Sequence, residues 1–112
     1  MKITNQIKNQ IGILSIEGDI ISQTVAELKD YFETFVEKEH ITGIILDCEK
    51  AEYIDSAGLG LIASFYKTLM QLNKKFAIAS VNVRMMESFT LTNLNNIFTI
   101  TKDIQAAIDF MS

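Results

Sequence analysis

The chain has 112 residues and a formal net charge of −4. This length fits one domain, spanning residues 1–112, and leaves no room for two of ordinary size. Hydrophobic residues make up 48% and charged residues 21% of the chain, a balance typical of a packed core rather than disorder. The acidic charge, with no basic cluster beyond Lys74-Lys75, argues against binding to nucleic acid, whose backbone is negatively charged.

Cysteine usage and hydropathy bear on the compartment. Cys48 is the only cysteine, so the chain can form no internal disulfide and no cysteine-rich metal site. The first residues are polar and alternating, without the apolar run of a signal peptide. No window approaches the ~20 consecutive apolar residues of a transmembrane helix. We therefore expect a cytoplasmic protein that does not engage a membrane.

The first half of the chain predicts a hairpin, a helix and a buried strand. Apolar and polar residues alternate in two segments separated by a polar turn. Apolar residues at helical spacing follow, with Ser22 or Thr24 as the cap and an end at about Glu39. An uninterrupted apolar run is then typical of a strand buried on both faces. The strands are expected at residues 3–7, 11–18 and 42–47.

The second half continues as alternating helices and strands, so the predicted order is ββαβαβαβα. Such alternation implies right-handed crossovers and a parallel arrangement. We expect an α/β fold with a mixed, mostly parallel sheet of about five strands, about four helices, and functional loops at the carboxyl ends of the strands. The helices are expected at residues 56–73, 83–91 and 103–111, and the strands at 76–79 and 97–100.

The start of the helix at Ser56 carries the strongest functional signal. Ser56 follows a buried strand, where its hydroxyl can simply cap the helix. However, Gly58 and Gly60 occupy the first turns, where each glycine costs ~1 kcal/mol relative to alanine. Their benefit is a surface without side chains, flanked by the apolar Leu59 and Ile62, over which a partner backbone could pass. Capping and modification both remain open for this serine.

A phosphate on Ser56 would feel opposing local effects. The helix N-terminus favours the added negative charge, whereas Asp55 beside it disfavours that charge. Burying the dianion unpaired in an apolar contact would weaken partner binding by orders of magnitude.

Two chemical roles compete with a modified serine. A nucleophilic Ser56 needs a general base, but His40, the only histidine, precedes the strand that Ser56 follows, and a strand of six residues spans ~20 Å. Asp47 and Asp55 could bind a divalent cation, although Asp55 can instead help to cap the helix. We expect no catalytic site, no metal and no cofactor.

Several motifs together resemble the STAS domain family, and within it the bacterial anti-sigma factor antagonists. These are the hairpin, the Gly18-Asp19-Ile20 turn, the buried strand ending in Asp47 and the Asp-Ser-Ala-Gly-Leu-Gly segment at residues 55–60. Later residues 91–94 and 97–98 match the last helix-to-strand turn of the family. The resemblance covers essentially the whole chain and implies a STAS fold.

The resemblance also implies a mechanism. In that family an anti-sigma factor with a histidine-kinase-like ATPase fold phosphorylates the serine that matches Ser56, and a serine phosphatase of the PP2C kind removes the phosphate. The unphosphorylated antagonist binds the anti-sigma factor and releases the sigma factor. The partner surface expected around Ser56 consists of Asp19, Asp55, Ala57, Gly58, Leu59, Gly60 and Ile62.

The chain departs from the family pattern at three positions. Ile21 stands where a second acidic residue or asparagine is frequent, which weakens a polar contact with the kinase at that loop. Ala57 replaces a frequent serine, so Ser56 is the only hydroxyl of the motif. Asn93 replaces a frequent glycine before the last strand, and asparagine tolerates the left-handed backbone that such a turn needs.

Two other functions compete with the antagonist. A STAS scaffold or adaptor outside sigma-factor control, of the stressosome or chemotaxis type, would keep the fold. A small enzyme would use Ser56 or the pair Asp47 and Asp55. A transporter-appended STAS domain is less expected, because the chain begins at Met1 of the domain and contains no membrane span.

Overall fold

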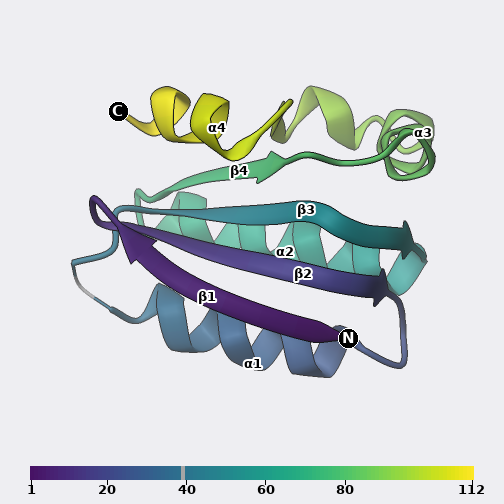
Figure 1. Cartoon of the computed structure of the whole chain (residues 1–112), viewed down its shortest axis with the longest axis horizontal. Coiled ribbons are helices and arrows are strands. Elements are labelled where there is room, and N and C mark those ends of the chain that lie inside the picture. The colour runs from purple at the N-terminus through teal and green to yellow at the C-terminus, as the bar shows by residue number, and fades with distance from the viewer. Residues whose placement is uncertain (39) are drawn as a thin grey trace.

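The computed structural model describes residues 1–38 and 40–112 and confirms the predicted order of elements. Five strands form one sheet, and helices pack on both of its faces (Figure 1). The strands are β1 Lys2–Lys8, β2 Ile11–Ile20, β3 Gly43–Ile54, β4 Lys75–Ala79 and β5 Thr99–Thr101. The helices are α1 Val25–Val36, α2 Ser56–Gln71, α3 Val83–Leu91, the 3-10 turn η1 Leu94–Asn96, and α4 Ile104–Met111. In this described part, no helix is long and apolar enough to cross a membrane.

The sheet is mixed, as predicted. Its strand order is β1-β2-β3-β4-β5, with β1 antiparallel to β2 and the other neighbours parallel. The β1–β2 turn has two residues, Asn9 and Gln10, with φ of 51° and 67°. Two consecutive left-handed residues are typical of a type I′ turn, whose twist matches that of the strands it joins.

The core has two parts, one on each face of the sheet. On the first face α1 and α2 lie together (Figure 1). The rings of Phe32 and Phe65 stack between these helices, with 3.8 Å between the ring centroids. On the second face α4 covers Ile13 and Ile45 with Ala107 and Ile108. Helix α4 leaves the β1 side of this face open (Figure 1).

The loop before α1 differs from the prediction. The helix begins at Val25, and Thr24 occupies the cap position without capping it. Its hydroxyl instead donates to the backbone oxygen of Asp19 at 2.8 Å and accepts from the backbone nitrogen of Ile21 at 3.0 Å. Thr24 therefore shapes the β2–α1 loop. The helix ends at Val36, and the predicted end at Glu39 lies outside the described residues.

Strand β3 is much longer than predicted, since it passes Asp47 and ends at Ile54. Its pairing with β2 shifts by one residue after Asp47 and again before Ile54. Each such bulge adds an unpaired residue to the strand. The inward residues Cys48, Ala51 and Ile54 consequently recur every third position, which hides the strand from a search for alternation.

The last strand was predicted two residues too early. Ile97 is exposed and follows η1, and β5 begins only at Thr99. Phe98 between them is buried against Phe89 at 6.0 Å between ring centroids. Asn93, which precedes η1, has φ 60° and ψ 13°, so the predicted left-handed conformation is confirmed.

Helix α3 is fixed to the part of β3 that extends beyond β4. Asn82 caps α3 by accepting from the backbone nitrogen of Met85 at 2.8 Å. Its side-chain amide also donates to the backbone oxygens of Ala51 and Glu52, at 3.3 and 2.9 Å. One side chain therefore joins α3 to the segment that leads into α2.

Candidate functional site

The loop between β2 and α1 is attached to the start of α2 by Asp55. The backbone nitrogen of Asp55 donates to the oxygen of Ile20 at 3.2 Å. Its carboxylate accepts from the backbone nitrogen of Gly58 at 2.9 Å through Oδ1, and from that of Ser22 at 3.0 Å through Oδ2. Asp55 is therefore both the N-cap of α2 and the link between the two segments.

These contacts also set the charge at the site. The hydrogen bond from the Gly58 backbone lowers the pKa of Asp55, and the bond from Ser22 lowers it further. Donors that bind the charged form favour ionisation of a carboxyl group. A fixed negative charge therefore stands directly before Ser56.

Ser56 is the first residue of α2, and its side chain is exposed. The interpretation of Ser56 as the helix cap is wrong, because Asp55 fills that role. Within residues 1–38 and 40–112 the Ser56 hydroxyl takes part in no hydrogen bond between protein groups. The serine is thus held at a helix start with its hydroxyl available to solvent.

The two glycines of the motif have different environments. Gly58 is buried, and a Cβ added there would collide with the backbone oxygen of Ile20 and lie 2.7 Å from Cγ1 of Ile54. Gly60 is exposed, and beyond the chain neighbours and nearby backbone of its own helix a Cβ added there would meet no described atom within 4 Å. Gly58 is therefore required for packing against β2, which corrects its expected place on the partner surface.

Ile62 also needs correction, because its side chain is 0% exposed and belongs to the core. The inward side of α2 consists of Gly58, Ile62, Phe65 and Leu69. The accessible part of the motif is smaller than expected: Ser56 and Gly60 are exposed, and Ala57 and Leu59 are half-buried.

Asp19 lies at the same edge of the sheet as Ser56. It is half-buried next to Ile20, whose oxygen binds Asp55. The preceding Gly18 has φ +105°, a conformation that side-chain-bearing residues rarely adopt. Ile21, at the departure from the family pattern, is half-buried. The β2–α1 loop thus borders the exposed part of the motif, with Asp19 as an acidic residue there.

Asp47 and Asp55 are not brought together. Asp47 accepts from the Ser15 hydroxyl at 2.9 Å and from the Glu49 nitrogen at 3.2 Å, midway along β3. In the part of the chain that is described, no group of three potential metal-ligating His, Cys, Asp or Glu side chains occurs. The neighbouring Cys48 is fully buried, and this burial, with the charge of Asp47, raises the pKa of its thiol to about 12. It is a packed, neutral side chain.

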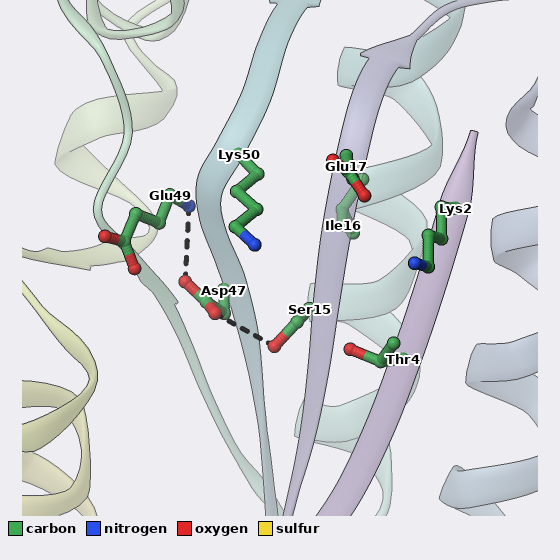
Figure 2. Close-up of a pocket in the computed structure, with 8 residues that line it drawn as sticks. All are labelled: Lys2, Thr4, Ser15, Ile16, Glu17, Asp47, Glu49 and Lys50. Carbon is green, nitrogen blue, oxygen red and sulfur yellow. Dashed lines mark hydrogen bonds between the residues drawn. The ribbon is translucent and has the colours of Figure 1, made fainter.

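A polar hollow of about 300 Å³ lies beside Asp47 on the sheet face that α4 leaves open (Figure 2). Charges of both signs surround it, and no residue of the α2 start contributes to its wall. Its lining consists of Lys2, Thr4, Ser15, Ile16, Glu17, Asp47, Glu49 and Lys50. The hollow is therefore separate from the Ser56 surface.

His40 and Ser56 lie at opposite ends of β3. His40 precedes the strand and Ser56 follows it, so that the 12 residues of β3 separate them. At ~3.3 Å per residue the length of β3 exceeds any hydrogen-bond distance many times over. His40 cannot serve Ser56 as a general base.

Two contacts of the β3 segment that precedes Asp55 were not predicted. The guanidinium group of Arg84 lies 5.0 Å from the ring centroid of Tyr53, close to the attachment of α3 by Asn82. Asn82 before a predicted helix was a recognisable cap signal. Its contacts with β3 could not be anticipated, because β3 was expected to end before the residues that it binds.

Comparison with known proteins gives a consistent result. The STAS domain family model matches residues 2–107. An anti-sigma-B factor antagonist of Staphylococcus aureus is 28% identical over 102 residues, which cover 91% of this chain and 94% of the relative. The corresponding protein of Listeria monocytogenes is 28% identical over 85 residues, covering 76% and 74%.

Solved structures share the fold. A Thermotoga maritima protein described as an anti-sigma factor antagonist superposes with a TM-score of 0.91 and 26% identity, covering 97% of this chain and 93% of its own. The phosphorylated form of the Bacillus cell fate determinant SpoIIAA gives 0.76 at 17% identity, with 99% and 100% coverage. At that identity the second comparison concerns the fold alone.

Proposed function

The chain belongs to the STAS domain family, and on that premise we propose that it is an anti-sigma factor antagonist controlled by phosphorylation of Ser56. The observation that carries the proposal is the exposed Ser56 hydroxyl, which makes no hydrogen bond to another protein group in the described part of the chain and lies beside the open Gly60. In this proposal residues 1–112 form one STAS domain that acts in the cytoplasm as a non-catalytic regulator.

The proposed partners follow from the relatives. Proteins named anti-sigma-B factor antagonists match most of the chain, so the partner is an anti-sigma factor. We further propose that it has a histidine-kinase-like ATPase fold and phosphorylates Ser56, and that a PP2C-type phosphatase reverses this. Support for Ser56 as a substrate rather than a nucleophile comes from its distance to His40, since a nucleophilic serine needs a base within hydrogen-bond reach.

Phosphorylation would act on the contact itself. Ser56, Ala57, Leu59 and Gly60 form a small surface on which a partner backbone can lie closely. A phosphate adds about −1.5 to −2 charge, next to an Asp55 that is already ionised. Covering these two anionic groups with a partner surface that offers no paired donors would remove their hydration without replacement. The fold can stay unchanged while binding is lost.

Phosphate transfer is the direct test. Incubation with the cognate kinase and ATP should add one phosphate, and Ser56→Ala should abolish the mass increase. Ser64→Ala is the matched control, because Ser64 is an exposed serine of the same helix whose hydroxyl donates to the oxygen of Leu61. Ser56→Asp should weaken partner binding at least tenfold, or ~1.4 kcal/mol. Phosphate found elsewhere, or partner binding unaffected by Ser56→Asp, would contradict the proposal.

One observation favours a second function, a STAS scaffold or adaptor outside sigma-factor control. Val83 and Leu91 on α3 are 74% and 85% exposed, and apolar side chains grouped on a surface can mark a protein contact. A scaffold role predicts assembly through α3. Sedimentation of Leu91→Asp beside the unchanged chain tests it: loss of an assembled form would favour the scaffold, and a monomer in both cases would oppose it.

A further inference from the structure

Asp55 and Ser56 are consecutive residues, and both are of a type that caps helices well. The helix could therefore begin at either residue. In the observed register Oδ1 of Asp55 accepts from Gly58, and the Leu59 nitrogen donates to the backbone oxygen of Asp55 at 2.9 Å. In a register starting one residue later, the Ser56 hydroxyl would be the acceptor, three residues before Leu59.

The choice of register decides what the Ser56 hydroxyl can do. As a cap it would point back at the helix with an oxygen lone pair engaged by a backbone N–H. As the first helical residue it is exposed and has no such bond. We infer that Asp55 is a positioning residue for Ser56 phosphorylation, because it takes the cap position and so keeps the serine hydroxyl free. This inference rests on the proposed function.

Asp55 outcompetes Ser56 for the cap because it has two acceptor oxygens. Oδ1 holds Gly58 while Oδ2 holds Ser22 of the β2–α1 loop. A serine hydroxyl has one oxygen and cannot reach both donors. Hydrogen bonds to an ionised acceptor are also the stronger ones, and the lowered pKa of Asp55 agrees with this charge.

The reaction that this arrangement serves is a phosphoryl transfer. The Ser56 oxygen forms a bond to the γ-phosphorus of ATP while the bond from that phosphorus to the leaving ADP oxygen breaks. The hydroxyl proton passes to a base that the kinase supplies. A hydroxyl that is already oriented toward solvent meets the in-line geometry without first breaking a cap bond.

The chain contains a matched control in α4. Asp103 caps α4 by accepting from the Ala106 nitrogen at 2.8 Å, the same position and nearly the same length as at α2. The residue after it is Ile104, which has no hydroxyl, and in the described residues the Asp103 carboxylate accepts from no second donor, while the Thr101 hydroxyl donates to the Asp103 backbone oxygen. Removing either cap should disturb one helix start to a similar degree, but only one of them precedes the phosphoacceptor.

The experiment compares steady-state phosphorylation of the full chain with substitutions at the two caps. Asp55→Ala should lower kcat at least tenfold, because Ser56 becomes the cap. Asp55→Asn keeps an oxygen for Gly58 but cannot accept from Ser22 through its nitrogen, so it should restore kcat to within about threefold. Asp103→Ala should leave kcat unchanged. Amide hydrogen exchange should show protection lost at Gly58 in Asp55→Ala and retained in Asp55→Asn.

The outcomes separate the two ideas. If Ser56 of the unchanged chain is not phosphorylated, the proposed function fails. If it is phosphorylated and Asp55→Ala has the same kcat, only the positioning role is overturned. Equal losses of kcat in Asp55→Ala and Asp103→Ala would also overturn it, since the effect would then be one of general stability. Should Asp55→Ala not fold, Asp55→Asn decides: its side-chain oxygen keeps the cap on Gly58, and a kcat at least tenfold below that of the unchanged chain would overturn the inference.

Discussion

The first turns of α2 and α4 are built alike and behave differently. Each helix is capped by an aspartate that binds the backbone nitrogen three residues later, Asp55 to Gly58 and Asp103 to Ala106. In α2 that third residue is pressed against β2 and tolerates no side chain, whereas in α4 alanine is accommodated. An aspartate cap therefore begins both helices, but only the start of α2 is packed tightly against β2 and hydrogen-bonded to a loop.

The largest effect is expected from Gly58→Ala, which gives α2 the residue that α4 has. The new methyl group would meet the backbone oxygen of Ile20, which cannot move away as a flexible side chain could. Overpacking of this kind costs about 1–3 kcal/mol, more than alanine gains in helix propensity. Urea denaturation should show the loss in the free energy of unfolding.

The reciprocal change, Ala106→Gly, is the control for that experiment. It should cost no more than ~1 kcal/mol, the ordinary difference between the two residues in a helix. If Gly58→Ala had the same free energy of unfolding as the unchanged chain, the expected collision of its methyl group with the Ile20 oxygen would be contradicted.

Gly60→Ala should have a smaller effect of opposite sign on stability. Apart from its chain neighbours and the helix's own nearby backbone, no described atom lies within 4 Å of the added Cβ, so the helix should gain up to ~1 kcal/mol in the free energy of unfolding. The same methyl group would stand on the proposed partner surface and should weaken binding of the anti-sigma factor in a titration. A variant that is more stable and binds equally well would remove Gly60 from that surface.

The smallest expected effect is a pH dependence of the free energy of unfolding that arises from Asp55 at the start of α2. Because the folded-state pKa of Asp55 lies below its ordinary value of 3.8, its contribution to stability is present above that value and is lost as the pH falls through the folded pKa. Denaturation series between about pH 6 and pH 3 should show a shallower decline for Asp55→Asn than for the unchanged chain. Parallel curves would contradict the assigned bonds.

Local chemistry was enough to predict much of the fold. The order of the elements followed from apolar spacing, and the bounds of α3 were predicted to the residue. Asn93 was expected in a left-handed conformation because its short polar side chain tolerates one, and it has φ 60°. Each of these features is decided by a few neighbouring residues.

Features that depend on contacts between distant segments were mispredicted. The extension of β3 was missed because two bulges against β2 replace its alternation with a repeat of three. Gly58 and Gly60 look equivalent in the sequence, and only the position of Ile20 distinguishes them. Asp55 was recognised as a possible cap, but its bond to Ser22, 33 residues away, lies beyond any local pattern.

The reactivity of the buried Cys48 can report how often the folded molecule opens. Its thiol lies in the core between the sheet and its helices, fully buried and neutral at physiological pH, so a thiol-labelling reagent can reach it only when that core opens. Since it is the only cysteine of the chain, the labelling rate reports one event without an engineered probe. Measured before and after phosphorylation, that rate distinguishes a change confined to the surface from one that loosens the core.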